Sequence, residues 1–265
     1  MTRTVALLSG GKDSLYNMYW AKKNSHEVVA IVNLKPGAHA NDELDSYMYQ
    51  TVGHQAIEKI AQALDTPLFR ADITKTANVK DLDYTPPQDS DDEVEILYNL
   101  LKDIREKHGI PFGAISVGAI ASEYQYNRIR NICSRLGDVY VMNFLFNRDQ
   151  DSLLQEMIDN RFDAILIKVA CMGLNKEHLG KSIKEMQEHL RRLHQEHGAN
   201  ICGEGGEYET LVLDCPLYKK RLSIDRAEFI CHSEDVFAPV YYMNPVEVSL
   251  VEKNNDEESG EQFRD

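Results

Sequence analysis

Short apolar runs alternate with amphipathic stretches through the first 146 residues of this chain, and this alternation constrains the fold more than any other feature. The runs have the length of strands, and the stretches between them carry apolar residues at a helical period. Strands are predicted at residues 5–8, 28–32, 67–73, 113–120 and 139–146, and helices at residues 14–24, 43–64, 92–107 and 122–136. Such alternation is typical of parallel strands joined by right-handed crossovers. Sheets of this kind bind ligands at the carboxyl ends of their strands.

The pattern changes after residue 147. A helix is predicted at 150–161, a strand at 163–171 and a helix at 182–197, followed by short β runs with turns from 211 to 251. These elements indicate a second, smaller α+β domain. Residues 252–265 contain six acids, two bases and almost no apolar residue, which is typical of a disordered tail. The predicted division is therefore 1–147 for the first domain, 148–250 for the second and 251–265 for the acidic tail.

Residues 9–14, with the sequence SGGKDS, directly follow the first apolar run and open the first predicted helix. Glycines lack a Cβ atom, so this backbone can turn sharply and approach an anion closely. The helix offers N–H groups and the positive end of its dipole, and Lys12 adds a full charge. The SGGKDS loop therefore predicts a phosphate site, with a glycine-rich turn that binds nothing as the alternative. A Walker A loop is disfavoured, because Ala6 replaces its first glycine and Asp13 follows the lysine.

The composition argues against several classes of protein. A formal net charge of −14 disfavours a nucleic-acid partner, because a negative field repels phosphate backbones. The chain has no apolar run long enough to suggest a membrane span. Its five cysteines include no C-x-x-C pair, which disfavours a disulfide framework and a zinc site. The apolar stretch at the N-terminus is too short for a signal peptide, so a cytoplasmic protein is expected.

Residues 203–210, with the sequence GEGGEYET, contain three glycines and three glutamates and are named here the glutamate segment. Core strands do not have this composition, so the segment is predicted to be a loop. Its carboxylates could bind a metal, an organic cation or ammonium, and an acidic surface turn is the alternative. The glycines indicate unusual backbone geometry, so both a ligand site and an acidic surface turn remain open for this segment.

Residues 122–130 are predicted to open the helix after the fourth strand, at the same end of the sheet as the SGGKDS loop. Ser122 is a candidate N-cap. Tyr124, Gln125 and Arg128 can then point over the strand ends. There, Arg128 could hold a phosphate or a carboxylate through two hydrogen bonds. A solvated basic face is the alternative for this segment.

These segments carry a resemblance to known enzymes. The SGGKDS loop resembles the SGGxDS loop of the ATP pyrophosphatases, which split ATP between the α- and β-phosphates and hold the leaving pyrophosphate there. Together with residues 42–54, 117–128 and the glutamate segment, it resembles the diphthine–ammonia ligases from the first strand to about Asp235. The resemblance implies an α/β fold. Its N-terminal parallel-sheet domain would be of the adenine nucleotide alpha-hydrolase (PP-loop) type, with a smaller C-terminal α+β domain.

The resemblance implies a reaction in which ammonia is joined to the carboxylate of diphthine, a modified histidine of elongation factor 2. The implied cofactors are ATP and Mg²⁺, and the implied partners are elongation factor 2 carrying diphthine and ammonium. The carboxylate would attack the α-phosphate, and ammonia would then displace AMP from the acyl-adenylate. Free ammonia is favoured as the nitrogen donor, because no amidotransferase domain with a nucleophilic cysteine is evident.

The resemblance also implies three groups of site residues. The catalytic group is Lys12, Asp13, Glu204 and Glu207, with Asp13 also a ligand of Mg²⁺. The nucleotide-binding group is Ser9, Gly10, Gly11, Lys12, Asp13, Ser14 and Asn33. The substrate-binding group is Tyr124, Gln125, Arg128, Gly205, Gly206, Tyr208, Glu209 and Thr210. The glutamates and tyrosines would hold the trimethylammonium group of diphthine, or a glutamate would bind ammonium and take its proton. The spacing after Gln125 leaves Arg130 as an alternative to Arg128.

Three other functions are weighed against this one. A tRNA-modifying pyrophosphatase is disfavoured by the acidic charge and the missing C-x-x-C pairs, and a nicotinamide or guanylate synthetase does not explain the glutamate segment. A nucleotide sensor without turnover has no need of Lys12 and Asp13, because such groups stabilise a leaving pyrophosphate. Residues 74–92 are predicted to form a long loop that docks the partner or covers the site.

Overall fold

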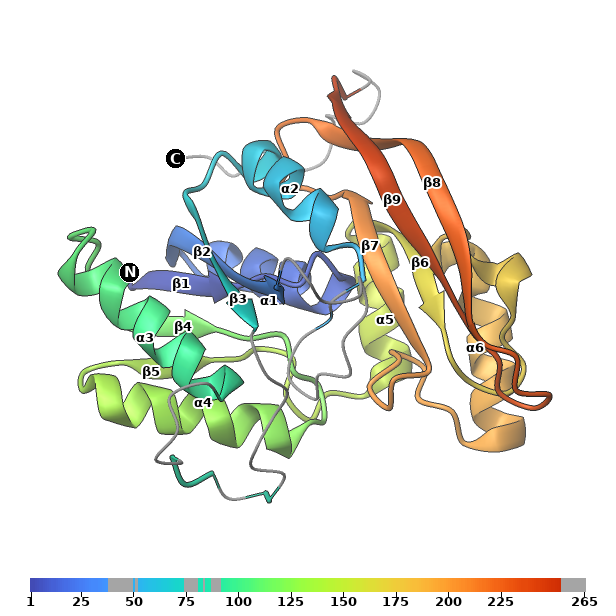
Figure 1. Cartoon of the computed structure of the whole chain (residues 1–265), viewed down its shortest axis with the longest axis horizontal. Helices are drawn as coiled ribbons and strands as arrows, with labels where there is room; N and C mark the ends of the chain where they lie inside the picture. Colours follow the sequence, from blue (N-terminus) through green and yellow to red (C-terminus); the bar gives the residue numbers. More distant parts are fainter. Residues whose placement is uncertain (38–49, 51, 74–80, 83, 87–91, 254–265) are drawn as a thin grey trace.

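Two sheets, one parallel and one antiparallel, organise the computed structural model of the chain (Figure 1). The structure describes residues 1–37, 50, 52–73, 81–82, 84–86 and 92–253. The start of the helix predicted at 43–64, most of the loop predicted at 74–92 and most of the predicted acidic tail lie outside the described residues.

The first sheet has five parallel strands. In spatial order they are β3 (Leu68–Ile73), β2 (Glu27–Pro36), β1 (Arg3–Leu7), β4 (Ala114–Ser116) and β5 (Tyr140–Met142). The helices that connect them are α1 (Lys12–Lys23), α2 (Ile57–Leu64) with the short 3₁₀ helix η1 (His54–Ala56), α3 (Glu93–Glu106) and α4 (Glu123–Leu136). The parallel α/β fold expected from the alternating pattern is therefore confirmed.

The pattern of each helix explains which face it buries. In α3, an apolar stripe that includes Val94, Leu97, Leu101 and Ile104 is buried against the sheet. The side chain of Asp92 begins this helix by accepting a hydrogen bond from the backbone N–H of Val94. Helices α3 and α4 share one core cluster, whereas α1 and α2 belong to another. The first sheet is thus covered on both faces.

Strands β4 and β5 are shorter than the predicted strands 113–120 and 139–146. The chain leaves the sheet after Ser116, because the next residues approach the start of α1. A Cβ atom on Gly118 would lie 2.5 Å from the backbone carbon of Asp13. The apolar residues beyond Ser116 therefore line a site and contact helices instead of extending the strand.

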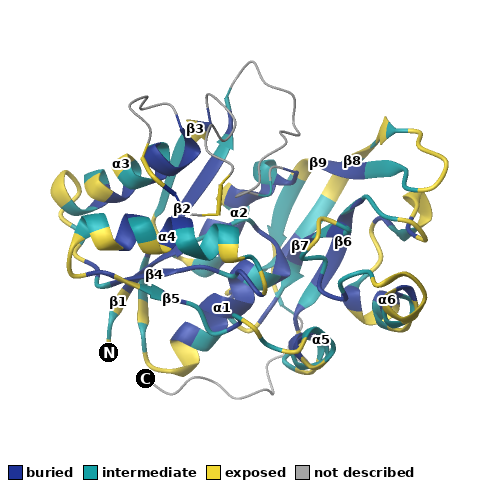
Figure 2. Ribbon diagram, turned by 90° about the horizontal axis from the view of Figure 1, so that it is seen from below, coloured by how far each residue is buried: buried dark blue, intermediate teal, exposed yellow. Residues whose placement is uncertain are grey.

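The second sheet has four antiparallel strands. In spatial order they are β7 (Tyr208–Asp214), β6 (Asp163–Val169), β9 (Val240–Val251) and β8 (Arg221–Ser233). Its helical elements are α5 (Gln150–Asp159), η2 (Lys176–His178) and α6 (Ile183–His197). The outward sides of α5 and α6 are exposed, while strands β6 and β7 are largely buried (Figure 2).

Two predictions for this half are wrong. The short β runs expected between 211 and 251 include two long strands, β8 and β9, which pair from Arg221 with Val251 to Ser233 with Val240. Register shifts near Arg226 and after Cys231 interrupt the alternation, so that β-bulges resemble turns in the sequence. The glutamate segment is only partly a loop, because β7 already begins at Tyr208.

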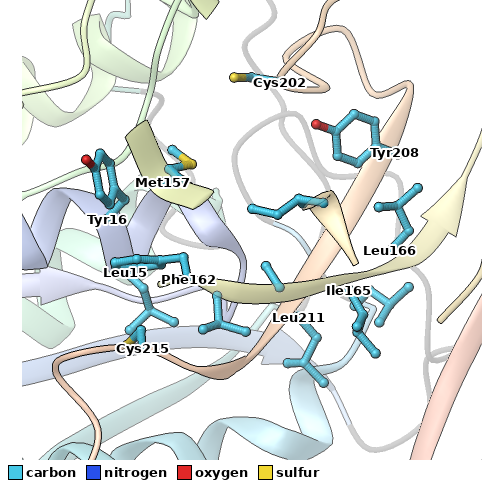
Figure 3. Close-up of a cluster of buried hydrophobic side chains, with 14 of the residues drawn as sticks. Leu15, Tyr16, Met157, Phe162, Ile165, Leu166, Cys202, Tyr208, Leu211 and Cys215 are labelled. Carbon is cyan, nitrogen blue, oxygen red and sulfur yellow. The ribbon is translucent and has the colours of Figure 1, made fainter. Parts of the chain in front are cut away.

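The core runs from one sheet to the other without interruption. A single cluster of buried side chains includes Leu15 and Tyr16 from α1, Met157 from α5, and Ile165 and Leu211 from the second sheet (Figure 3). This shared packing holds β7 against the beginning of α1. The division at residue 147 remains a prediction. None of the helices in the described ranges combines the length and apolarity needed to cross a membrane.

Candidate active site

A cavity of about 170 Å³ opens at the carboxyl ends of β1, β2 and β4, next to the first residues of β7. The chain connects β1 to β2 on one side of β1, and β4 lies on the other side. This is the point in an open parallel sheet where a crevice forms and ligands bind. The cavity is lined from both halves of the chain, with Ser9, Lys12, Asp13 and Ser14 facing Glu204, Tyr208, Glu209 and Thr210.

The SGGKDS loop is held in shape by its own hydroxyl groups. Gly10 has a φ of 87°, a conformation that residues with a Cβ atom rarely adopt. The backbone N–H of Gly11 donates to Oγ of Ser9 at 3.2 Å, and the hydroxyl of Ser14 donates to the carbonyl of Gly11 at 3.0 Å. Gly11 is the N-cap of α1 and provides no side-chain cap. The N-cap residue therefore brings no negative charge to the positive end of this helix, which faces the cavity.

Strand β7 and the residues before it clamp this loop. The backbone N–H of Lys12 donates to Oγ1 of Thr210 at 3.0 Å, and the N–H of Val212 donates to the carbonyl of Gly10, also at 3.0 Å. The Lys12 ammonium donates to the carbonyl of Cys202 at 2.5 Å. The backbone N–H and the ammonium of Lys12 are thus both held by residues of the C-terminal half of the chain, so the N-terminal and C-terminal halves form one site.

Lys12 and Asp13 form a buried ion pair. Only 2% of the Lys12 side chain is exposed, and its Nζ lies 2.9 Å from Oδ2 of Asp13. Burial alone would lower the pKa of Lys12, but the neighbouring Asp13 carboxylate raises it well above its usual range. Burial raises the pKa of Asp13, and Lys12 opposes that rise. Lys12 therefore keeps its charge inside the cavity wall.

The second carboxylate oxygen of Asp13, Oδ1, is buried and has no hydrogen-bond partner among the described residues. An oxygen in this state is suited to a hard cation such as Mg²⁺, which protein sites often bind through one or two carboxylates together with phosphate oxygens. No group of three His, Cys, Asp or Glu side chains forms a metal site within the described ranges. The donor set fits an ion that a nucleotide brings with it.

Glu204 joins the glutamate segment to the first sheet. Its Oε2 accepts hydrogen bonds from the backbone N–H groups of Ile120 at 3.1 Å and Ala121 at 2.9 Å. Burial and the nearby Asp13 charge raise the pKa of Glu204, and the two N–H donors partly oppose this. Gly203 allows this approach, since a Cβ atom there would lie 2.7 Å from the carbonyl oxygen of Tyr208.

The other two glutamates of the segment are placed differently. Glu207 accepts hydrogen bonds at 2.8 Å from the backbone and the side chain of Asn200 through Oε1, and from the N–H of Gly205 through Oε2. Glu207 is not part of the cavity lining, and its carboxylate braces the turn that carries Glu204. Glu209 does line the cavity, and its Oε1 lies 3.3 Å from Nζ of Lys168.

The two glycines predicted to bind substrate shape the same turn. A Cβ atom on Gly205 would lie 2.8 Å from Oε1 of Glu207, so a larger residue would displace the brace. Gly206 has a φ of 83°, which strains any residue with a Cβ atom. Both glycines are exposed and lie outside the cavity lining.

The two candidate tyrosines already face cations of the chain. The Lys12 ammonium lies 5.1 Å from the centre of the Tyr208 ring, and the Tyr208 hydroxyl donates to the carbonyl of Ile201 at 2.6 Å. The guanidinium carbon of Arg128 lies 3.2 Å from the centre of the Tyr124 ring. These faces are therefore engaged by internal cation–π contacts.

Arg128 is fully buried behind the cavity and does not line it. It donates to the backbone carbonyls of Tyr124 at 3.3 Å and Asp81 at 3.0 Å. Arg130, the alternative from the sequence, is exposed. Neither arginine lies in the cavity lining, whereas Gln125 of the same helix does.

Asn33 lies at the carboxyl end of β2, as expected, and lines the cavity. Its Nδ2 donates to the carbonyl of Leu8 at 2.9 Å, and its Oδ1 accepts from Nε of Arg70 at 3.0 Å. Next to Asn33, the apolar side chains of Val32 and Leu34 form part of the cavity wall. This wall is suited to the flat, apolar faces of a base.

Several residues of the cavity were not predicted, and Gln50 and Gly118 are the two polar or glycine residues among them that shape the loop most directly. Gln50 lines the cavity and donates through Nε2 to the carbonyl of Thr210 at 3.0 Å. Gly118 lines it as well, and it allows the end of β4 to pack on the first turn of α1. Both lie in segments that carry the family resemblance, so a residue-by-residue reading of those segments is the signal that could have found them.

Comparisons with known proteins identify the family of the chain. Family models match residues 2–139, as the diphthamide synthase N-terminal domain, and residues 149–244, as the diphthamide synthase C-terminal domain. A Danio rerio protein named diphthine–ammonia ligase is 50% identical over 243 residues, which cover 91% of this chain and 93% of the relative. A Homo sapiens protein of the same name is 46% identical over 258 residues, covering 95% and 93%.

A solved structure also resembles the chain, but too weakly to carry an argument. It is the U34-tRNA thiolase NcsA from Methanococcus maripaludis with its 4Fe–4S cluster. The TM-score is 0.35 and the identity 16%, over 78% of this chain and 71% of that one.

Proposed function

The chain belongs to the diphthamide synthase family, and from this premise we propose that it is an ATP-dependent diphthine–ammonia ligase acting on elongation factor 2 in the cytoplasm. The enzyme joins ammonia to the carboxylate of diphthine and converts ATP to AMP and pyrophosphate. One observation carries the proposal: the SGGKDS loop and Glu204 line the same cavity, so a nucleotide and a cationic substrate can meet there.

In the first step, an oxygen of the diphthine carboxylate attacks the α-phosphate of ATP, and the bond between the α- and β-phosphates breaks. The positive end of the α1 dipole and the hydroxyl of Ser9, which lines the cavity, are suited to hold the leaving pyrophosphate. Lys12 offsets the charge that develops on it. The raised pKa of Lys12 supports this role, because the ammonium keeps its proton in a buried place.

Asp13 is the residue that would hold Mg²⁺, through its buried Oδ1. When bound, the ion would neutralise part of the phosphate charge. Lys12 and Asp13 therefore have separate roles in the proposal, although they are paired in the structure. Lys12 acts on the phosphates directly, and Asp13 both orients Lys12 and offers a ligand.

In the second step, ammonia attacks the carbonyl carbon of the acyl-adenylate. A carbon–nitrogen bond forms, and the bond from that carbon to the phosphate oxygen of AMP breaks. We assign to Glu204 the role of the base that takes the proton of ammonium, because Glu204 both lines the cavity and has a raised pKa. The nitrogen loses its second proton to solvent as the amide forms. Glu207 is then a positioning residue that holds the turn through Asn200 and Gly205.

The trimethylammonium group of diphthine is a cation and needs negatively charged groups around it. The rings of Tyr124 and Tyr208 face Arg128 and Lys12, which leaves the carboxylates of Glu204 and Glu209 as the better partners in the cavity wall. Electrostatic attraction by these two groups, and not an aromatic cage, is therefore the proposed basis of substrate recognition.

The direct test is to identify the products. The purified protein with ATP, ammonium and elongation factor 2 that carries diphthine is expected to release AMP and pyrophosphate and to form the amide, which mass spectrometry detects. Asp13→Asn should abolish AMP formation in a folded protein, whereas the exposed Asp65→Asn should keep it. Release of ADP, or turnover that depends on tRNA, would show that the protein has another function.

A further inference from the structure

The turn between β8 and β9, residues 234–239, exposes two adjacent apolar side chains. Val236 is 88% exposed and Phe237 is 74% exposed. Phe229, four residues before the last residue of β8, is 64% exposed as well. Exposed apolar residues scattered singly are common, whereas contiguous exposed apolar side chains mark interaction sites.

This hairpin turn has a defined shape. The side chain of Asp235 accepts hydrogen bonds at 2.8 Å from the backbone N–H groups of Phe237 and Ala238. The strands on either side are paired up to Ser233 and Val240. The turn therefore presents Val236 and Phe237 in a fixed direction and loses little conformational freedom when it binds.

The hairpin turn lies at the same end of the second sheet as the glutamate segment. Backbone pairing joins Tyr208 to Val169, Val169 to Tyr241, and Tyr241 to Cys231, in one row across the four strands. Beyond this row the chain forms the turn before β7, the turn after β6 and the hairpin turn (Figure 1). Neighbouring strands are roughly 5 Å apart, so the hairpin begins about 10–15 Å from the cavity wall at Tyr208.

We propose that the hairpin turn, through Val236 and Phe237, docks the protein that carries diphthine. This inference rests on the proposed function. The cavity of about 170 Å³ can admit a modified side chain but not the domain to which that side chain belongs. The rest of the substrate must therefore contact the surface around the cavity. A typical interface covers roughly 800 Å² on each partner, which is wide enough to include both the cavity and the turn.

The charges around the turn favour a foreign protein over a second copy of this chain. Glu234 and Asp235 are exposed beside the apolar pair. A symmetric contact between two copies would bring these acids together, and the net charge of −14 adds to that repulsion. The chemistry expected of the partner is an apolar depression with a basic rim. Met172, 45% exposed in the turn after β6, extends the apolar surface towards the glutamate segment.

The test compares the wild type with V236S/F237S, which leaves the Asp235 cap in place. Amidation of diphthine-bearing elongation factor 2 is measured over a range of its concentration, and the affinity for the same protein is measured by fluorescence anisotropy. We expect KM and Kd for the protein to rise at least about tenfold, since exposed aromatic anchors carry much of an interface's energy. The kcat, the KM for ATP and the melting temperature should stay unchanged. Tyr140→Ser is the matched control, because Tyr140 is 49% exposed at the start of β5, the opposite end of the first sheet.

Each other outcome overturns the inference. An unchanged KM and Kd in V236S/F237S would mean that the turn does not dock the substrate. A fall in kcat or melting temperature would mean that the two residues act through the fold. A wild-type dimer that the double substitution dissociates would identify a second copy as the occupant. If the wild type forms no amide at all, the proposed function itself fails, which the first arm of the experiment detects separately.

Discussion

The backbone N–H of Lys12 donates a hydrogen bond of 3.0 Å to the hydroxyl of Thr210, which lies 198 residues further along the chain. Both residues are buried. This hydrogen bond lies beside the one from the N–H of Val212 to the carbonyl of Gly10, so strand β7 of the second sheet fixes the SGGKDS loop of the first sheet. The phosphate site is consequently a product of both halves of the chain.

Replacement of Thr210 tests this dependence. Thr210→Val keeps the shape of the side chain but leaves the N–H of Lys12 buried without an acceptor, which typically costs about 1–3 kcal/mol of stability. We expect the loop to shift and the KM for ATP to rise by about tenfold. Thr210→Ser retains the hydroxyl and should behave like the wild type in urea unfolding and in AMP release. Equal stability and equal AMP release in the Thr210→Val and Thr210→Ser variants would show that the hydrogen bond has no role.

Gly118→Ala is expected to damage the same loop from the other side. Its new Cβ atom would lie 2.5 Å from the backbone carbon of Asp13 and 2.6 Å from the N atom of Ser14, and neither backbone atom can move without α1. Overpacking of this kind typically costs about 1–3 kcal/mol. Titration calorimetry should detect no ATP binding in a variant that still unfolds cooperatively. Gly113→Ala is the control, since its nearest neighbour is a flexible methyl group at 3.4 Å. Normal ATP affinity in Gly118→Ala would contradict the close approach.

The sequence was sufficient to predict the parallel sheet and the position of the SGGKDS loop, because periodicity and glycine geometry are local properties. It could not separate the three glutamates, since their roles depend on distant groups. Glu204 meets the N–H of Ile120, whereas Glu207 meets Asn200. Likewise, the composition of residues 122–130 gives no sign that Arg128 packs on Tyr124 behind the cavity. Tertiary contacts decided these placements.

Glu204 makes stability depend on pH in a predictable direction. Burial, and then the Asp13 charge, raise its folded pKa above the ordinary value. Between the unfolded and folded pKa values the folded state binds more protons, so the contribution of Glu204 to stability falls as the pH rises through this window. Glu204→Gln keeps an acceptor for Ile120 and Ala121 but removes the buried charge. We therefore expect its melting temperature to exceed that of the wild type by roughly 2–4 °C at pH 8 and by less at pH 5, while amide formation is lost.

Glu207→Gln provides the comparison for that experiment. Its carboxylate accepts three hydrogen bonds within its own turn, so the variant should melt below the wild type at both pH values. A Glu204→Gln protein that is less stable than the wild type at pH 8, or one that retains amide formation, would contradict the role assigned to Glu204.

The buried Lys12–Asp13 pair should separate stability from catalysis in a double-mutant cycle. Lys12→Met leaves the Asp13 carboxylate without its ammonium, and loss of one partner of a buried pair typically costs about 3–5 kcal/mol. In K12M/D13N no buried charge is left, so urea unfolding should show recovery of much of that loss, whereas AMP formation should stay absent in both variants. The exposed pair of Lys107 and Asp103, 2.8 Å apart, is the control, and its coupling should be below about 1 kcal/mol. Additive losses of stability at Lys12 and Asp13 would show that the pair is not coupled. AMP formation by the double variant would show that the pair is not catalytic.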